Sequence, residues 1–273
     1  MPKYLIAALD MDGTLLTSQK TIHPDTIRDI TEASEKGVHV VYCSGRAPAE
    51  LQEYLSILPC MRYAICMSGA LVYDLDQHKN IYTNPVSKEL AIEIAKAAKE
   101  DDGMVHLLTE SESIVRADQI THMADFHMGI YQTMFLNIAK TVPDIEEEIE
   151  KHDTISKINI YFHSTSARQQ AYEKLKHLPL AFAFGEETSL EMTAQGVTKA
   201  NGLLALASHL NVPLSQVLGI GDADNDRSVL TIVGFPIAMG NAKEEIKSIC
   251  KVTTDDNDHN GTGKAIRKYC LEN

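Results

Sequence analysis

The feature that most constrains the fold of this 273-residue chain is an alternation of short apolar runs with amphipathic helical segments near both ends. The first apolar runs are LIAAL (5–9), VHVVYCS (38–44) and YAICMS (63–68), and helical periodicity separates them. Runs this short and this apolar are typical of strands that are buried on both faces of a parallel sheet. The pattern therefore predicts an α/β core with a Rossmann-like, doubly wound parallel sheet.

The middle of the chain has a different rhythm, with strands that follow one another without obvious crossovers and helices expected on one side of them. The expected helices are 87–103, 143–152 and 166–178, and the expected strands are 104–109, 156–163, 180–184 and 189–193. After Lys199 the first pattern returns. We therefore expect a core formed by residues 1–84 and 192–273, with an α+β cap domain (85–191) inserted into it.

The charge balance excludes some functions. Lys and Arg total 25 and Asp and Glu total 38, which gives a formal net charge of −13 without a basic stripe. This argues against binding to nucleic acid. No apolar run approaches the roughly 20 residues that span a bilayer, and no signal pattern opens the chain, so we expect no membrane partner and a cytoplasmic location. Oligomeric state does not follow from the sequence.

Polar residues gather where the expected parallel strands end, at the edge where open α/β sheets bind ligands. The set comprises Asp10, Asp12, Ser44, Gly45, Arg46, Asp222, Asn225 and Asp226, with Lys199 at the start of the preceding helix. Carboxylates packed together repel one another unless a hard cation binds them, and oxygen ligands favour Mg²⁺. A cation, a lysine, a hydroxyl group and backbone N–H groups are what a transferring phosphoryl group requires.

The spacing of Asp10 and Asp12 suits two different tasks. One aspartate can act as a nucleophile and form an aspartyl-phosphate. A second, two residues later on an extended segment, points to the same side, where it can protonate the leaving oxygen and then activate water. Gly13 lets the chain turn without a Cβ atom near the phosphate.

Four segments resemble, in order, the four motifs of the haloacid dehalogenase-like phosphohydrolases: DMDGTLL (10–16), CSGR (43–46), GVTKANGL (196–203) and GDADND (221–226). The long insertion resembles the type-IIB cap of the Cof-like branch, and the resemblance covers nearly the whole chain. It implies that Asp10 is the nucleophile and a Mg²⁺ ligand, and that Asp12 is the general acid and base, with its carbonyl facing the metal. The other implied roles are phosphate binding by Ser44, Lys199, Asn225 and the amides of Met11 and Gly45, and metal binding by Asp222 with Asp226 as a direct or supporting ligand.

The resemblance implies a Mg²⁺-dependent phosphatase acting on a small phosphorylated metabolite such as a sugar phosphate, pyridoxal phosphate or a nucleotide. Arg46 is a candidate substrate contact, with a surface ion pair as the alternative. Two departures are visible: Ser68-Gly69-Ala70 replaces the Asn-Gly-Ala that is usual in this branch, and RSVL (227–230) follows GDADND where the family often continues towards a methionine. Two other functions stay open, a phosphomutase or phosphotransferase with the same site, and a non-catalytic sensor of a phosphometabolite.

Overall fold

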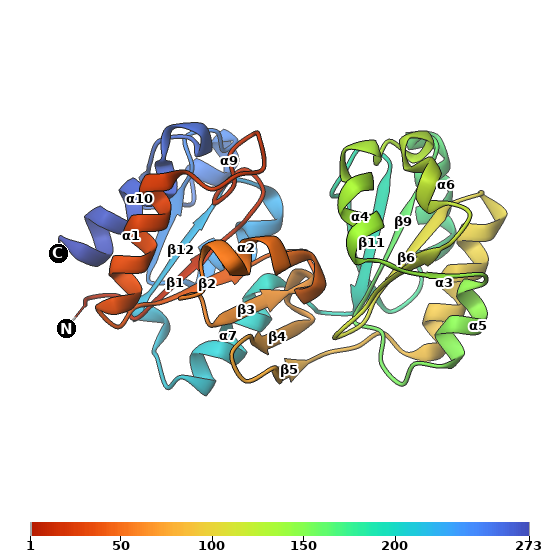
Figure 1. Cartoon of the computed structure of the whole chain (residues 1–273), viewed down its shortest axis with the longest axis horizontal. Helices are drawn as coiled ribbons and strands as arrows, with labels where there is room; N and C mark the ends of the chain where they lie inside the picture. The colour runs from red at the N-terminus through yellow and green to blue at the C-terminus, as the bar shows by residue number, and fades with distance from the viewer. Residues whose placement is uncertain (1, 273) are drawn as a thin grey trace. The chain divides into compact units, whose positions relative to one another are not determined.

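The structure, a computed structural model, describes residues 2–272, and its contacts divide the chain into two compact units (Figure 1). The first unit comprises Met1–Gly45, Gln52–Tyr82 and Thr198–Asn273, and the second comprises Arg46–Leu51 and Thr83–Val197. The domain bounds expected from the sequence stay a prediction: a core of residues 1–84 and 192–273, with residues 85–191 inserted. Within the described residues, no helix is long and apolar enough to cross a membrane.

The first unit contains an eight-stranded sheet with the order β14-β13-β12-β1-β2-β3-β4-β5. Its strands are β1 (Ile6–Leu9), β2 (His39–Cys43), β3 (Tyr63–Cys66), β4 (Leu71–Asp74), β5 (Lys79–Thr83), β12 (Val217–Gly221), β13 (Phe235–Ala238) and β14 (Val252–Thr253). Neighbours from β14 to β3 are parallel, and β4 is antiparallel to β3. The winding reverses between β1 and β12, which confirms the doubly wound parallel sheet.

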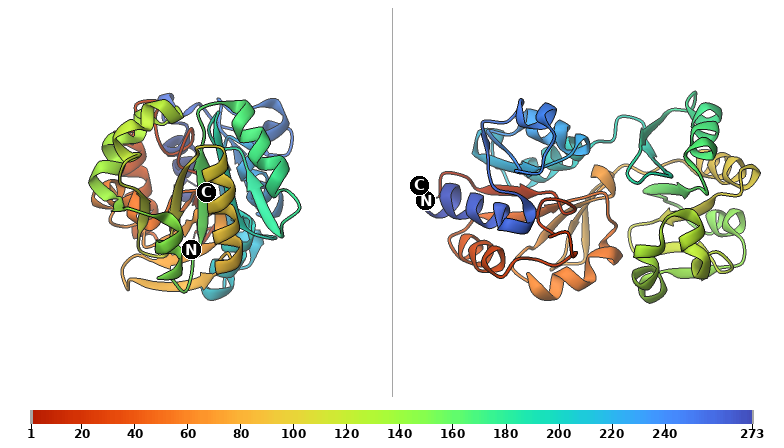
Figure 2. Two further views of the ribbon diagram at one scale, coloured as in Figure 1. Left: turned by 90° about the vertical axis from the view of Figure 1, so that its right-hand side faces the viewer. Right: turned by 90° about the horizontal axis from the view of Figure 1, so that it is seen from above.

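Helices cover both faces of this sheet (Figures 1 and 2). They are α1 (Pro24–Glu35), α2 (Gln52–Ile57), α7 (Lys199–His209), α8 (Arg227–Ile232), α9 (Glu244–Lys247) and α10 (Gly261–Ile266). On one face, Ile6 and Ala8 of β1 share a buried cluster with Leu203 and Leu206 of α7. The alternate β1 residues, Ala7 and Leu9, point the other way and are also buried, as a central strand requires. The packing holds the carboxyl end of β1 rigidly.

The second unit contains a six-stranded sheet with the order β10-β11-β9-β6-β7-β8. Its strands are β6 (Met104–Leu108), β7 (Ser113–Arg116), β8 (Lys140–Val142), β9 (Lys157–Tyr161), β10 (Leu180–Ala183) and β11 (Ser189–Ala194). All neighbouring pairs are antiparallel except β7 and β8. Helices α3 (Lys88–Glu100), α5 (Ile145–Glu150) and α6 (Thr165–Leu175) lie on one face (Figure 2). The α+β class expected for this part of the chain is confirmed.

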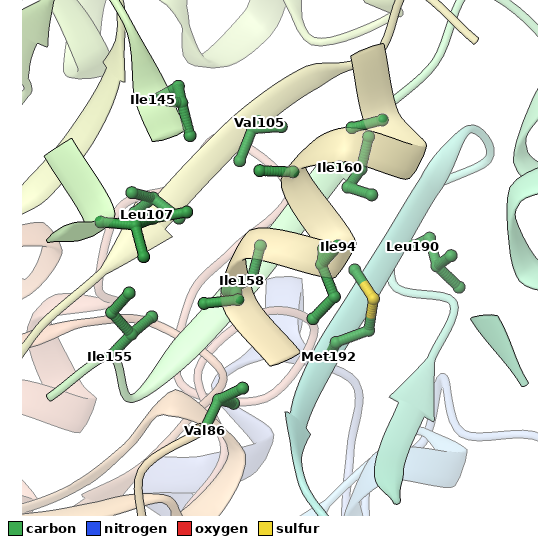
Figure 3. Packing of buried hydrophobic residues seen from close by; sticks show 14 of the residues in the cluster. Val86, Ile94, Val105, Leu107, Ile145, Ile155, Ile158, Ile160, Leu190 and Met192 are labelled. Carbon is green, nitrogen blue, oxygen red and sulfur yellow. The ribbon is translucent and has the colours of Figure 1, made fainter. Parts of the chain in front are cut away.

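The main core of this unit fills the space between the sheet and those three helices. Ile158 and Ile160 of β9, with Leu107 of β6, pack against Ile94 of α3 and Ile145 of α5 (Figure 3). These side chains alternate with polar ones along β9, so only one face of the strand carries aliphatic groups. The alternation of isoleucines with polar residues in the sequence therefore sets which face of the sheet meets the helices.

The expectation of helices on only one side of this sheet was wrong. The opposite face is covered by the short helices η3 (Ile120–Phe126), η4 (Gly129–Tyr131) and α4 (Gln132–Ile138). Met123, Phe126 and Phe135 from this segment pack with Met104 and Tyr161 of the sheet. The segment was not predicted because its apolar residues are spaced for short helical turns rather than for one long amphipathic helix.

Candidate active site

The sheet register brings the first and fourth motifs together. Leu9 at the end of β1 lies opposite Ile220 of β12, and the Asp10 amide donates to the Ile220 carbonyl at 3.1 Å. Asp10 and Asp222 therefore leave adjacent parallel strands at the same edge, where the winding of the sheet reverses. This is the position at which open α/β sheets bind ligands.

A buried lysine lies between two of the carboxylates. Lys199 Nζ donates to Asp10 Oδ1 at 2.5 Å and to Asp226 Oδ1 at 2.6 Å. All three residues are at least nine-tenths buried. Asp226 also accepts, through Oδ2, from the amides of Asp222 at 3.0 Å and Ala223 at 3.2 Å. Asp226 thus fixes both the lysine and the loop that carries Asp222.

The charges in this group set its protonation behaviour. Burial raises the pKa of Asp10 well above its usual range, and the charge of Asp226 adds to this effect, while Lys199 opposes it. Burial acts to lower the pKa of Lys199, but the carboxylates of Asp10 and Asp226 outweigh it and raise that pKa. Burial also raises the pKa of Asp222 to about 6, against the opposing hydrogen bond from Thr14. The lysine is therefore charged, and burial favours the protonated form of Asp10 and of Asp222.

Three carboxylates in this site offer ligand atoms that lie within 4.8 Å of one another: those of Asp10, Asp222 and Asp226. They face one ammonium, that of Lys199, and repulsion between the carboxylates contributes to the raised pKa of Asp10 and of Asp222. Gly13 leaves the space beside Asp222 open, since a Cβ atom there would lie 2.5 Å from Asp222 Oδ2. An oxygen-only donor set with this charge fits a hard divalent cation.

A second group of possible ligands, Glu112, Glu148 and His152 in the second unit, has a different character. Lys140 Nζ lies 2.7 Å from Glu148 Oε1, and Lys151 Nζ lies 3.0 Å from Glu148 Oε2. The hydrogen bond from Lys140, with that from Lys151, lowers the pKa of Glu148 to about 2 against the opposing effect of burial. Two ammonium groups already neutralise these carboxylates, so this group is an ion-pair network.

Asp12 lies apart from the buried carboxylates. Its side chain is 41% exposed, and its Oδ1 accepts from Lys20 Nζ at 2.7 Å. Gly13, with φ +83°, turns the chain directly after it. The two aspartates of the first motif therefore have different environments: Asp10 is buried against a lysine, and Asp12 is partly solvated. Such a difference separates a nucleophile from a group that exchanges protons.

The remaining candidate residues are placed as follows. Ser44 is buried at the end of β2, where its amide donates to the Ile65 carbonyl at 2.8 Å. Met11 is buried beside Asp10, and Gly45 follows Ser44. Asn225 is exposed in the short helix η6 (Asp224–Asp226). Arg46 belongs to the second unit, so its role as a substrate contact stays a prediction.

Two residues that position the site were missed by the sequence reading. Thr14 is buried and donates from Oγ1 to Asp222 Oδ1 at 2.9 Å, so it orients the Asp222 carboxylate. Gly69 has φ +99°, and a Cβ atom on it would lie 2.0 Å from the Thr198 carbonyl oxygen. The start of α7, which carries Lys199, can approach β3 only because residue 69 lacks a side chain. The sequence shows Ser68-Gly69-Ala70 only as a departure from the pattern of the Cof-like branch.

The structure thus combines an α/β fold with a group of acidic residues at the edge where the winding of the sheet reverses, and comparison with known proteins identifies its family. A model of the haloacid dehalogenase-like hydrolases matches residues 7–266. The chain therefore belongs to the haloacid dehalogenase-like hydrolase family, in its Cof-like branch.

Named relatives extend over the same length. The phosphatase YwpJ of Bacillus subtilis is 25% identical over 284 residues, covering 96% of this chain and 98% of the relative. The 5-amino-6-(5-phospho-D-ribitylamino)uracil phosphatase YcsE of the same organism is 26% identical over 269 residues, covering 97% and 96%. A sugar phosphatase of HAD subclass IIB has the same fold, with a TM-score of 0.80, 22% identity and coverage of 97% and 98%. The chain is thus an enzyme of the phosphoric monoester hydrolase class.

Proposed function

We propose that the protein is a Mg²⁺-dependent phosphatase that hydrolyses a small phosphorylated metabolite through an aspartyl-phosphate intermediate. The observation that carries the proposal is the buried group of Asp10, Lys199 and Asp226, with Asp222 beside it. A buried carboxylate next to an ammonium and two further carboxylates has the charges that phosphoryl transfer needs. A purely structural ion pair would not require the additional carboxylate of Asp222.

In the first half-reaction, the Asp10 carboxylate attacks phosphorus and the bond from phosphorus to the ester oxygen breaks. Asp12 gives its proton to that departing oxygen, which leaves as an alcohol. Lys199 stabilises the negative charge on the phosphoryl oxygens, together with the Ser44 hydroxyl and the amides of Met11 and Gly45. In the second half-reaction, Asp12 takes a proton from water, the water oxygen attacks phosphorus, and the bond to Asp10 breaks to release inorganic phosphate.

Asp10, Asp222 and the Asp12 carbonyl are the groups that would hold Mg²⁺, with Asp226 in support. The ion would supply positive charge that offsets the mutual repulsion of the carboxylates and the phosphate. Both Asp226 oxygens already accept hydrogen bonds, from Lys199 and from two amides, which supports a positioning role for this residue.

We infer small phosphate monoesters as the substrates, in the classes of sugar phosphates, pyridoxal phosphate and nucleotides. The relatives support a small substrate, since one is named for a phosphoribityl compound and another is a sugar phosphatase. The acidic composition of the chain, with a net charge of −13, is consistent with a free small ester rather than a nucleic acid.

The test is a panel of these esters and 4-nitrophenyl phosphate, assayed with Mg²⁺ and with excess chelator. We expect hydrolysis that depends on Mg²⁺ and is abolished in Asp10→Asn, which keeps the shape of the side chain but removes its charge. Single-turnover release of free phosphate without an acceptor distinguishes a phosphatase from a phosphotransferase. Turnover by Asp10→Asn at the wild-type rate would refute the mechanism, and a lack of hydrolysis across the panel would favour the sensor.

A further inference from the structure

The loop after the first motif returns to the aspartate that follows Asp10. Lys20 lies eight residues beyond Asp12, and its ammonium donates to Asp12 Oδ1 at 2.7 Å. The side chains of the pair are 36% and 41% exposed. An ion pair this exposed contributes only about 0–1 kcal/mol to folding, so stability alone gives little reason for it.

Backbone pairing fixes the conformation of the loop between Asp12 and Ile22. Leu16 forms a parallel bridge with Asp12 and an antiparallel bridge with Ile22. Leu16 is fully buried and Ile22 is 6% exposed, so both ends of the turn are anchored in the core. The Thr17 amide also donates to the Thr21 carbonyl at 2.8 Å. Lys20 therefore starts from a backbone position that is fixed relative to Asp12.

The backbone of Lys20 is itself in an unfavourable conformation. Its φ is +59°, in the left-handed region that favours glycine. Such a residue costs on the order of 1 kcal/mol and persists when its surroundings enforce it. The Lys20 amide donates to the Thr17 carbonyl at 2.9 Å, and the buried Tyr54 hydroxyl donates to the Lys20 carbonyl at 3.3 Å. A glycine would fit this position with less strain, but it would lack the ammonium group.

We propose that Lys20 is a positioning residue that holds the Asp12 carboxyl group for proton transfer. The inference rests on the proposed function, in which Asp12 protonates the leaving oxygen as the bond to phosphorus breaks. Lys20 restricts rotation of the Asp12 side chain and stabilises the negative charge that Asp12 acquires when it gives up its proton. The proton passes from Asp12 to the alkoxide oxygen, and Lys20 keeps its own protons throughout.

The test compares two leaving groups in the variant Lys20→Met, which retains most of the side-chain length. An alkoxide needs a proton to leave, whereas 4-nitrophenolate leaves without one. The measured quantity is kcat/KM, because it covers only the steps up to formation of the aspartyl-phosphate and omits the later use of Asp12 as a base. We expect kcat/KM to fall about tenfold for the best alkyl phosphate of the panel and no more than about twofold for 4-nitrophenyl phosphate.

Two further variants complete the experiment. Lys20→Arg keeps a cation and is expected to recover most of the lost alkyl phosphatase activity. Lys36→Met removes an exposed lysine that is paired with Glu32 at 2.9 Å outside the site, and we expect it to change kcat/KM for neither substrate. An equal fall for both substrates, or no fall, overturns the positioning role while the phosphatase assignment stands. A wild-type protein that hydrolyses neither substrate overturns both.

Discussion

Replacement of Lys199 by methionine tests the centre of the proposed site, because it removes a charge at nearly constant volume. Lys199 is 2% exposed, and its ammonium is the shared partner of Asp10 and Asp226. The variant leaves two buried carboxylates without a counter-charge. Breaking a buried ion pair by removing one partner costs about 3–5 kcal/mol. We expect the free energy of unfolding of the first unit to fall by that amount.

The loss should depend on pH in a defined direction. The pKa of Asp10 is already raised by burial and by Asp226. Without Lys199 one of the two carboxylates takes up a proton as the pH falls, and the repulsion between them is relieved. The difference in stability between wild type and Lys199→Met should therefore be largest above pH 7 and should shrink towards pH 5.

Chemical denaturation followed in the first unit, over this range of pH, measures the effect on stability, and kcat/KM on the best substrate measures the effect on catalysis. We expect kcat/KM to fall by at least about 100-fold, because the lysine is the only proposed side-chain cation on the phosphoryl oxygens. The double variant Lys199→Met/Asp226→Asn removes one of the stranded carboxylates and should recover stability but not activity. Full activity in Lys199→Met, or unchanged stability at pH 8, would refute the reasoning.

Three further predictions concern Gly69, His106 and Thr14. Gly69→Ala should destabilise the first unit by about 2–4 kcal/mol and lower kcat/KM, because its Cβ atom would meet the Thr198 carbonyl oxygen at 2.0 Å. Gly37→Ala is the control, since Gly37 also has a positive φ but its Cβ atom would meet nothing within 4 Å, so a similar loss there would contradict the packing argument. Burial and Lys157 lower the pKa of His106 to about 3. Below about pH 6.5 this histidine binds a proton in the unfolded chain but not in the folded chain, so the wild type loses stability as the pH falls. His106→Gln should reduce that loss by up to about 1.4 kcal/mol per pH unit, which denaturation between pH 6.5 and 4 would measure. Protons compete with Mg²⁺ for Asp222, whose pKa burial raises to about 6, so the apparent Mg²⁺ affinity should fall below that pH. Thr14→Val removes the hydrogen bond that lowers this pKa, so calorimetric titrations should find the pH midpoint of the affinity change at a higher pH. An unmoved midpoint would show that Thr14 does not lower the pKa of Asp222.

The positions of the side chains at the strand ends could be predicted from the sequence, because the register of parallel strands leaves them little freedom. Once β1 and β12 are neighbours, Asp10 and Asp222 must leave the sheet at one edge. The contacts that orient these groups could not be predicted in the same way. Thr14 meets Asp222 across 208 positions of sequence, and Gly69 meets Thr198 through the packing of a helix on a strand. Residue type alone does not indicate either contact.

The inserted unit shows a second limit of sequence patterns. Polar residues alternate with isoleucines along β9, which predicts a strand with one solvated face. Both Lys157 and Asn159 are nevertheless buried. Lys157 pairs with Glu191 at 2.5 Å, and the Asn159 side chain donates to the Tyr161 hydroxyl at 3.2 Å. Polar groups that pair with one another can occupy a buried face, and an alternating pattern does not distinguish them from solvated ones.

The start of α7 combines opposing electrostatic effects. A cation at the first position of a helix is disfavoured by the helix dipole, and burial of Lys199 adds to that cost. Asp10 and Asp226 offset both effects, but with Asp222 they bring three carboxyl groups to one lysine. Repulsion between these carboxylates therefore disfavours their close approach, and a divalent cation would relieve it. Mg²⁺ should therefore stabilise the folded protein in proportion to the logarithm of its concentration above the dissociation constant. This stabilisation should disappear in Asp222→Asn, whose thermal unfolding temperature should not respond to Mg²⁺, and a response equal to that of the wild type would show that the ion binds elsewhere.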